Sequence, residues 1–193
     1  MVPIEVLARF QEIQDRAAKA LLREPAAVTL ATVGEDGQPS ARVVLLRGLD
    51  ARGFVFYTNS TSRKGQQIAE NPRLALCFYW DPLAEQVRVE GVAEQISPTE
   101  ADAYWRGRPR EHQISAWASF QSQVLPSREA LEQRVLVVRG QFADREIDRP
   151  PYWTGYRVLP HRIEFWRSVE ARLHERVVYR RYGDTWITEL LYP

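Results

Sequence analysis

Hydrophobic positions recur with two different periods along this chain. Over residues 1–24 an apolar residue appears at about every third or fourth position between charged ones, which predicts an amphipathic helix. From residue 27 onward, apolar runs rich in β-branched and aromatic residues alternate with short polar turns such as EDGQ and DARG. We expect five strands in the first half of the chain. Their short links favour an antiparallel sheet or barrel over a repeated strand–helix–strand arrangement.

The second half is predicted to contain two helices before the chain returns to strands. Ser97, Pro98 and Glu100 supply an N-cap, a first helical position and a capping-box partner, so a helix is expected to begin there. A second helix is expected within residues 126–142, ending at Gly140, before a proline-rich loop and the final strands. The sequence contains no repeat and no dividing linker. The predicted fold class is α+β, an antiparallel barrel with peripheral helices.

Composition narrows the class of protein. Hydrophobic residues make up 45% and charged residues 26% of the chain, which is typical of a globular protein in water. The formal net charge of +1 provides no general attraction to nucleic acid or to an anionic membrane, so any anion site must be local. The single cysteine, Cys77, can form neither an intrachain disulfide nor a CxxC metal site. The sequence has no signal-peptide pattern and no apolar run of membrane length, and we expect a cytoplasmic protein.

A helix that begins with two cations indicates a first candidate anion site. Within FYTNSTSRKG, Ser62 is the predicted N-cap, so Arg63 and Lys64 occupy the first turn of the helix. The helix macrodipole disfavours cations there, whereas a phosphate would accept hydrogen bonds from free backbone N–H groups and from both side chains. A solvated basic turn explains the same residues without a ligand, because exposed lysine and arginine are common.

Arg42 is a second candidate. The alternation of strand side chains places it on the presumed core face with Val44 and Leu46. An arginine in that position is costly unless it is paired or bound to an anion. A strand end, however, also lets a long side chain reach solvent, so the pattern leaves both explanations open.

The stretch AYWRGRPREHQ contains a third candidate. Tyr104 and Arg108 are four residues apart and can meet on one helical face, and together with His112 they would surround a phosphate. A helix C-terminus that favours cations is an equally good explanation.

The stretch EFWRSVEARLHER contains a fourth candidate. In a strand, successive side chains point to opposite faces, so Arg172, His174 and Arg176 are predicted to lie side by side on one face. A solvated edge strand accounts for them equally well. Trp166 is interpreted first as a core residue, and Cys77 as a structural one.

Several well-defined enzyme motifs are absent from the sequence. It contains no HExxH, GxSxG, Walker A or GxGxxG pattern, which argues against zinc hydrolases, serine esterases, P-loop proteins and Rossmann enzymes. The remaining interpretation is an aromatic-rich barrel with several separate groups of basic residues. This combination predicts one multiply anionic ligand, or two anionic ligands.

These groups of basic residues occur within a series of motifs that resembles the pyridoxamine 5′-phosphate oxidase family. In the order of that family, the motifs are RVVLLRG, FYTNSTSRKG, NPRLALCFYW, EQVRVEG, RPREHQISAWAS, QS, IEFW and RLHER. The resemblance implies a single domain of residues 1–193, with an N-terminal helix in residues 1–24 and the family core in residues 25–193. It also implies an FMN-binding split β-barrel and a homodimer with FMN at the interface.

The resemblance further implies the residues of the site. The family's FMN contacts correspond to Arg42, Val43, Val44, Leu45, Leu46, Arg47, Tyr57, Thr58, Arg63, Lys64, Gln86, Gln121, Ser122, Trp166 and Arg176. Its substrate contacts correspond to Arg47, Tyr104, Arg108, His112, Arg172, Leu173 and His174. Arg172 is the first candidate for orienting the substrate and stabilising charge, with His174 beside it. Neither is assigned as an obligatory base, and no metal is implied.

The implied reaction is oxidation of pyridoxamine or pyridoxine 5′-phosphate to pyridoxal 5′-phosphate, with hydride transfer from C4′ to flavin N5 and oxygen as the final acceptor, giving hydrogen peroxide. One alternative is the related split-barrel oxidase that acts on a phenazine precursor, a substrate without phosphate. Another is a non-catalytic binder of FMN or pyridoxal phosphate. A nucleic-acid-binding barrel is a third, and the near-neutral charge counts against it.

The chain departs from the family pattern at three places. Arg47 stands where the family usually has lysine and His112 where it usually has serine, although both can donate to phosphate. After EFW the family usually has Gln-Gly, whereas this chain has Arg167 and Ser168. This change removes a glycine's conformational freedom and adds a cation near the flavin, so it bears on the geometry of the turn and on the level of activity.

Overall fold

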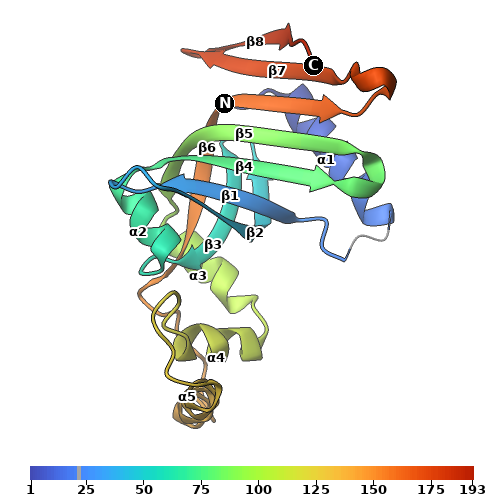
Figure 1. Cartoon of the computed structure of the whole chain (residues 1–193). Helices are drawn as coiled ribbons and strands as arrows, with labels where there is room; N and C mark the ends of the chain where they lie inside the picture. Colours follow the sequence, from blue (N-terminus) through green and yellow to red (C-terminus); the bar gives the residue numbers. More distant parts are fainter. Residues whose placement is uncertain (21–22) are drawn as a thin grey trace.

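The computed structural model describes residues 1–20 and 23–193, which form a closed antiparallel barrel with surrounding helices. The strands are β1 (Ala27–Val33), β2 (Pro39–Asp50), β3 (Gly53–Asn59), β4 (Arg73–Trp80), β5 (Glu85–Gln95), β6 (Trp153–Arg167), β7 (Glu175–Tyr182) and β8 (Thr185–Leu190). The helices are α1 (Ile4–Lys19), α2 (Arg63–Glu70), α3 (Pro98–Arg106), α4 (Arg110–Ala118) and α5 (Arg128–Gln141). The strand order is β3-β2-β1-β4-β5-β6-β7-β8, and an additional β3–β6 pairing closes the barrel (Figure 1). The predicted α+β barrel is confirmed.

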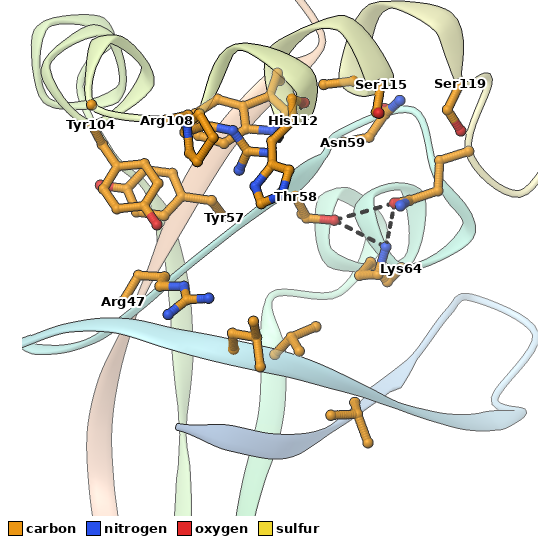
Figure 2. Close-up of a pocket in the computed structure, with 18 of the residues that line it drawn as sticks. Arg47, Tyr57, Thr58, Asn59, Lys64, Tyr104, Arg108, His112, Ser115 and Ser119 are labelled. Carbon is orange, nitrogen blue, oxygen red and sulfur yellow. Dashed lines mark hydrogen bonds between the residues drawn. The ribbon is translucent and has the colours of Figure 1, made fainter. Parts of the chain in front are cut away.

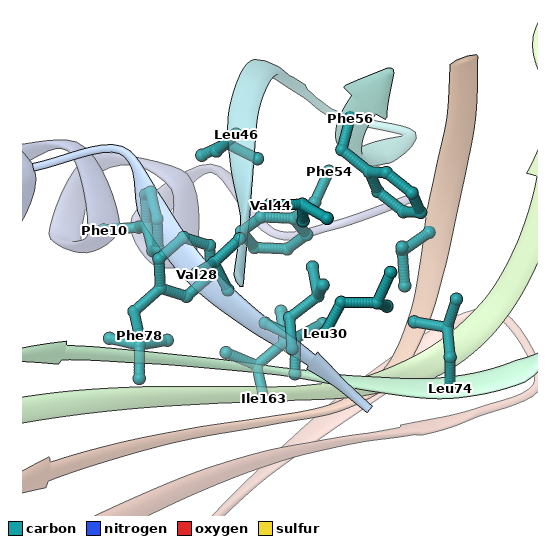
Figure 3. Close-up of a cluster of buried hydrophobic side chains, with 14 of the residues drawn as sticks. Phe10, Val28, Leu30, Val44, Leu46, Phe54, Phe56, Leu74, Phe78 and Ile163 are labelled. Carbon is teal, nitrogen blue, oxygen red and sulfur yellow. The ribbon is translucent and has the colours of Figure 1, made fainter. Parts of the chain in front are cut away.

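Apolar side chains from the strands fill the barrel, and α1 packs its apolar face against them (Figure 3). Phe10 of α1 is fully buried. Its ring centroid lies 4.9 Å from that of Phe78, 5.3 Å from that of Phe54 and 5.8 Å from that of Trp80. The three pairs meet edge to face, a favoured geometry for aromatic rings. The helix predicted at the N-terminus is therefore part of the core.

The 15-residue strand β6 has three different neighbours. Residues 153–158 pair with β3, residues 156–167 with β5, and residues 162–167 with β7. A register shift between Glu90 and Gly91 of β5 marks a bulge at which β6 bends as it changes neighbours. One strand thus closes the barrel and also joins the β7–β8 hairpin to it.

The helices between β5 and β6 agree with the sequence prediction in part. Ser97 caps α3 by accepting a hydrogen bond from the backbone N–H of Glu100 at 3.1 Å. The Glu100 carboxylate binds Arg157 of β6 at 2.6 Å, which ties α3 to the barrel. Helix α5 ends at Gln141, one residue beyond the predicted end. Helix α4 is not among the predicted elements, and it begins directly after Pro109.

None of the helices in residues 1–20 and 23–193 combines the length and the apolar character needed to cross a membrane.

We predict that Phe10→Ala lowers the free energy of unfolding by about 3–5 kcal/mol, because it removes a buried ring from three aromatic contacts and leaves a cavity. Ile4→Ala is the matched control on the same helix. The Ile4 side chain is 81% exposed, and its truncation should change the free energy by no more than about 0.5 kcal/mol. Urea unfolding at one fixed protein concentration measures both variants. Equal losses would contradict the placement of Phe10 in the core.

Candidate functional site

A cavity of about 980 Å³, which we call the main cavity, lies between strands β2 and β3 and helices α3 and α4. Figure 2 shows Arg47 and Tyr104 on one side of it and Lys64 on the other. The predicted site residues that line the cavity are Val43, Val44, Leu45, Arg47, Tyr57, Thr58, Lys64, Tyr104, Arg108, His112 and Gln121. The fold therefore brings together most of the residues predicted for FMN and for the substrate phosphate.

The start of α2 presents one of its cations to the main cavity. Ser62 caps the helix by accepting a hydrogen bond from the backbone N–H of Gly65, as predicted. A Cβ at Gly65 would lie 2.2 Å from a backbone carbonyl oxygen, so glycine is needed for this tight entry into the helix. Lys64 Nζ donates to Thr58 Oγ1 at 2.9 Å and to Gln121 Oε1 at 2.7 Å (Figure 2). These oxygens are uncharged, so they orient the ammonium group without neutralising it.

Three cations lie around this helix start: Arg42, Arg63 and Lys64. None of them forms an ion pair with a carboxylate in the described part of the chain. Arg42 donates to uncharged oxygens of Leu30, Thr32, Ser40 and Gln67. Burial lowers the pKa of Arg42, and the nearby charge of Arg63 lowers it further. Burial lowers the pKa of Lys64 to about 8, with a further contribution from Arg42. The protein environment therefore disfavours the positive charge that it collects here, which is the property expected of an anion site.

Aromatic rings form another wall of the main cavity. The Tyr57 ring stacks on Tyr104 at 3.9 Å and on Trp153 at 5.1 Å between centroids. Gly155 pairs with Tyr57 across the β3–β6 ladder, and a Cβ there would lie 2.9 Å from the Tyr57 ring. Burial raises the pKa of Tyr57 to about 12, with a further contribution from the charge of Glu100, so its hydroxyl stays protonated at neutral pH. Stacking thus fixes the ring of Tyr104 at the cavity.

Arg108 enters the main cavity from a turn and not from a helix. The prediction that it shares a helical face with Tyr104 is wrong, because α3 ends at Arg106. Its guanidinium carbon lies 4.8 Å from the ring centroid of Trp153 and 5.6 Å from that of Trp105. Burial lowers the pKa of Arg108, and its Nε atom is buried without a hydrogen-bond partner in the described residues. The turn nevertheless places Arg108 and Tyr104 in the same cavity.

Several cavity residues are missing from the sequence prediction. They are Asn59, Ala103, Gly107, Pro109, Ser115, Ala116, Ser119 and Trp153. Helix α4 contributes two of them, Ser115 and Ala116, and its start has no capping pattern in the sequence because its N-cap is a proline. Trp153 follows a proline-rich loop, and only the β3–β6 pairing brings it against Tyr57.

Three other predicted cofactor residues form one row across β5, β6 and β7, which we call the β6 row. Gln86 pairs with Trp166, and Trp166 pairs with Arg176. Directly opposed residues of antiparallel strands place their side chains on the same face. None of the three is among the described residues that line the main cavity. Figure 1 shows β7 near the top of the molecule and helix α4 toward the bottom, so the predicted cofactor contacts occupy two separate surfaces.

The predicted common strand face of Arg172, His174 and Arg176 is wrong. Strand β7 begins at Glu175, so only Arg176 of the three lies in a strand. Arg172 ends a short 3-10 helix, and both Ala171 and Arg172 have left-handed backbone angles, with φ of 55° and 62°. Such angles are uncommon for residues other than glycine, and the alternation rule does not apply to them.

A tight turn presents His174 beside the β6 row. His174 Nδ1 accepts a hydrogen bond from the backbone N–H of Val169 at 3.2 Å. The His174 ring centroid lies 4.8 Å from that of Trp166. Arg172 and Leu173 are both exposed next to it. This segment is therefore close to the β6 row, while its residues are absent from the lining of the main cavity in the described chain.

The remaining predicted residues lie outside the main cavity. Leu46 is buried in the barrel core, Arg63 is exposed at the start of α2, and Ser122 has a left-handed backbone with φ of 74°. Cys77 lies next to the β6 row, where its Sγ contacts Gln86 Oε1 at 3.5 Å and burial raises the pKa of its thiol. No group of His, Cys, Asp and Glu within the described residues is arranged to hold a metal ion.

We predict that Lys64→Met does not destabilise the ligand-free protein at pH 7 and increases its free energy of unfolding. The pKa of Lys64 is lowered on folding to about 8 from 10.5. The cost of its charge is therefore present in full below pH 8 and disappears as the pH rises toward 10.5. The advantage of the variant should shrink between pH 7 and pH 9 in urea unfolding.

Arg16→Met is the matched control for Lys64→Met. Arg16 binds the buried carboxylate of Glu85 at 2.8 Å, so removing it should destabilise the protein at pH 7. A loss of more than about 1 kcal/mol in Lys64→Met would contradict an uncompensated charge at this position.

Two family models match the chain. One is described as pyridoxamine 5′-phosphate oxidase and matches residues 14–142. The other is described as the pyridoxine 5′-phosphate oxidase C-terminal dimerisation region and matches residues 153–193.

Similar proteins and structures agree with these matches. The chain is 54% identical to a pyridoxine/pyridoxamine 5′-phosphate oxidase of Myxococcus xanthus (strain DK1622), over 100% of this chain and 94% of that protein. It is 56% identical to a pyridoxine/pyridoxamine 5′-phosphate oxidase of Alkalilimnicola ehrlichii, over 98% of this chain and 97% of that protein. Among solved structures, PhzG of Burkholderia lata 383 in complex with tetrahydrophenazine-1-carboxylic acid is 37% identical to this chain. The two structures superpose with a TM-score of 0.91, over 100% of this chain and 93% of PhzG. A pyridoxamine 5′-phosphate oxidase-related FMN-binding protein of Nostoc punctiforme shares the fold, at 20% identity and a TM-score of 0.77. The match covers 100% of this chain and 99% of that protein. The chain therefore belongs to the pyridoxamine 5′-phosphate oxidase family.

Proposed function

We propose that this protein is an FMN-dependent oxidase that converts pyridoxamine or pyridoxine 5′-phosphate to pyridoxal 5′-phosphate. The observation that carries the proposal is the distribution of charge in the main cavity. Lys64 lies on one side and Arg47 and Arg108 on the other, with stacked tyrosines beside them. Such a cavity suits two phosphate esters and two planar rings.

The residues at the start of α2 fit the phosphate of FMN. A phosphate monoester is close to a dianion at neutral pH and supplies several acceptor oxygens. The first-turn N–H groups of α2 and the side chains of Arg63 and Lys64 are the donors for it. The exposed apolar side chain of Val43 lines the same cavity and offers a surface for a flavin ring. Binding of the phosphate offsets the charge that the free protein leaves uncompensated.

Arg47, Tyr104, Arg108 and His112 are the proposed donors for the substrate phosphate. The Nε atom of Arg108 is buried without a partner, and stacking on Trp153 holds its guanidinium plane. Arg47 donates from a longer, forked side chain than the family's usual lysine, and His112 replaces a hydroxyl with an imidazole. Both replacements keep a donor at the phosphate.

Bound FMN would supply the redox chemistry, by taking a hydride from substrate C4′ at flavin N5 and passing the electrons to oxygen, which becomes hydrogen peroxide. The chain's own residues bind and orient. Arg172 is proposed to orient the pyridoxyl ring and stabilise its developing charge, with His174 beside it. Because Val169 N–H donates to His174 Nδ1, the other ring nitrogen, Nε2, is the one left to face the substrate.

A second copy of the chain is proposed to complete each site. In one chain the β6 row and the Arg172–His174 turn lie apart from the main cavity, and residues 153–193 match a dimerisation region. A homodimer in which the β6 row of one protomer faces the main cavity of its partner would unite both sets of predicted contacts around one FMN.

A phenazine-precursor oxidase is the alternative that the similarity to PhzG favours. The ligand named in that structure contains no phosphate. The cationic groups at Arg47 and Arg108 favour a phosphorylated substrate in this chain. A non-catalytic binder of FMN is the other alternative.

We predict that the FMN-loaded protein loses its visible flavin absorbance when mixed with pyridoxine 5′-phosphate in the absence of oxygen. Pyridoxine without phosphate, tested on the same protein, should require a concentration higher by a factor of about 100, because each lost charge-assisted hydrogen bond costs about 1.5–3 kcal/mol. Persistent yellow colour would identify a binder, and bleaching by a tetrahydrophenazine carboxylic acid alone would identify the phenazine enzyme.

We predict that Arg172→Ala and Arg63→Ala have different effects. Arg172→Ala should lower turnover by about 100-fold or more and leave the dissociation constant of FMN within about threefold of the wild-type value. Arg63→Ala should raise that constant by about tenfold, because it removes a charge-assisted hydrogen bond to phosphate. Fluorescence titration of FMN and steady-state kinetics separate the two effects. Equal loss of flavin in both variants would refute this division.

A further inference from the structure

Glu164 of β6 is a buried carboxylate to which neither the family resemblance nor the proposed mechanism gives a role. Its side chain is 1% exposed, on a strand where it alternates with the core residues Ile163 and Phe165. It therefore shares a face with Trp166 two residues later, and with the rest of the β6 row. Its cross-strand neighbours are Arg88 of β5 and Val178 of β7.

The two oxygens of Glu164 bind different arginines. Oε1 accepts from Arg176, at 2.9 Å from Nε and 2.8 Å from a terminal nitrogen. Oε2 accepts from Arg162 at 2.5 Å and lies 3.7 Å from Arg88. The other terminal nitrogen of Arg176 donates to the carbonyl oxygen of Tyr192 at 3.0 Å. All three nitrogens of the Arg176 guanidinium therefore have a partner within hydrogen-bond distance, and two of them share one carboxylate oxygen of Glu164.

The network extends away from Arg176 to a second carboxylate. Glu90 Oε1 accepts from Arg162 at 2.6 Å and from Arg88 at 3.1 Å. Glu90 makes no direct contact with Arg176 among the interactions of the described residues. It is a member of the same network that does not touch the predicted cofactor contact, which makes it a natural control.

Electrostatics keeps Glu164 ionised in this position. Burial alone would raise the pKa of its carboxyl, but the hydrogen bonds from Arg176 and Arg162 outweigh burial and hold the pKa below its ordinary value. A buried ion network of this kind is weak evidence for stability, since well-packed apolar residues often stabilise a protein as well or better. What an ion network provides and apolar residues do not is a fixed orientation for a guanidinium group.

We infer that Glu164 is a positioning residue that holds the Arg176 guanidinium in the orientation in which it contacts FMN. This inference rests on the proposed function, because it requires Arg176 to be an FMN contact. Glu164 does not touch the cofactor in this arrangement and acts through Arg176. The long side chain of arginine has many rotamers, and fixing it before binding reduces the entropy that binding must offset.

A double-mutant cycle in FMN affinity tests the inference. The variants are Glu164→Gln, Arg176→Ala and their combination, with Glu90→Gln and Glu90→Gln/Arg176→Ala as the matched control cycle. FMN dissociation constants are measured by quenching of flavin fluorescence, and urea unfolding of each ligand-free variant measures stability separately. We expect Glu164→Gln to weaken FMN binding by about tenfold. In the Arg176→Ala background the same substitution should change affinity by less than about twofold.

The outcomes are distinct. Loss of affinity that disappears when Arg176 is absent supports positioning, whereas equal losses in both backgrounds overturn it, because Glu164 would then act on stability or on FMN by another route. A loss for Glu90→Gln as large as for Glu164→Gln also overturns it. Should Glu164→Gln fail to fold, Glu164→Asp replaces it in the cycle, since it keeps the charge and withdraws the oxygens from Arg176. Failure of the wild-type protein to bind FMN would overturn the proposed function itself.

Discussion

The change of neighbour along β6 is the constraint on which both parts of the candidate site depend. β5 occupies one edge of this strand, so the other edge is shared between β3 and β7. Pro160 lies between the two segments, where neither β3 nor β7 pairs with it, so a residue without a backbone N–H can be accommodated on that edge. Pairing with β3 puts Trp153 against Tyr57 at the main cavity, and pairing with β7 aligns Trp166 with Arg176. A strand that stayed with β3 throughout would leave no edge for the second surface.

Charge compensation separates two cations of the main cavity, Lys64 and Arg108, from many other cations of the molecule, whereas Arg47 of the same cavity lies 4.0 Å from the Glu24 carboxylate. Several buried arginines outside the cavity meet carboxylates, as Arg157 does with Asp50 and Glu100. At the main cavity Lys64 and Arg108 meet uncharged oxygens and aromatic rings, and their pKa values are lowered mainly by burial. A ligand that binds only the folded state and carries the missing negative charge stabilises that state by mass action. Binding of such a ligand would therefore be coupled to folding at this cavity.

Local patterns predict the elements well and the placement of the site less well. The cap at Ser62, the cap at Ser97 and the alternation in β2 depend on neighbours in sequence, and all three predictions are confirmed. The prediction that Arg172 and His174 share a strand face is wrong because Ala171 and Arg172 adopt left-handed backbone angles. The sequence has no glycine there that would indicate such angles. The sequence also gives no sign of the contact between Glu164 and Arg176, since it depends on the register of two strands. The motif resemblance names the contacts but not the two surfaces on which they lie.

The departure at Arg167 and Ser168 illustrates how a chain can replace conformational freedom with an ion pair. Glycine is needed where φ is positive, but Ser168 is not among the described residues with a positive φ, so losing glycine there strains nothing. Arg167 pairs with Glu175 across β6 and β7, at 3.2 and 2.8 Å, and this closes the turn from both strands. The charge that arginine adds is met by that carboxylate. The unusual backbone lies a few residues later, at Ala171 and Arg172, so the strain is at the proposed substrate contact and not at the substituted turn.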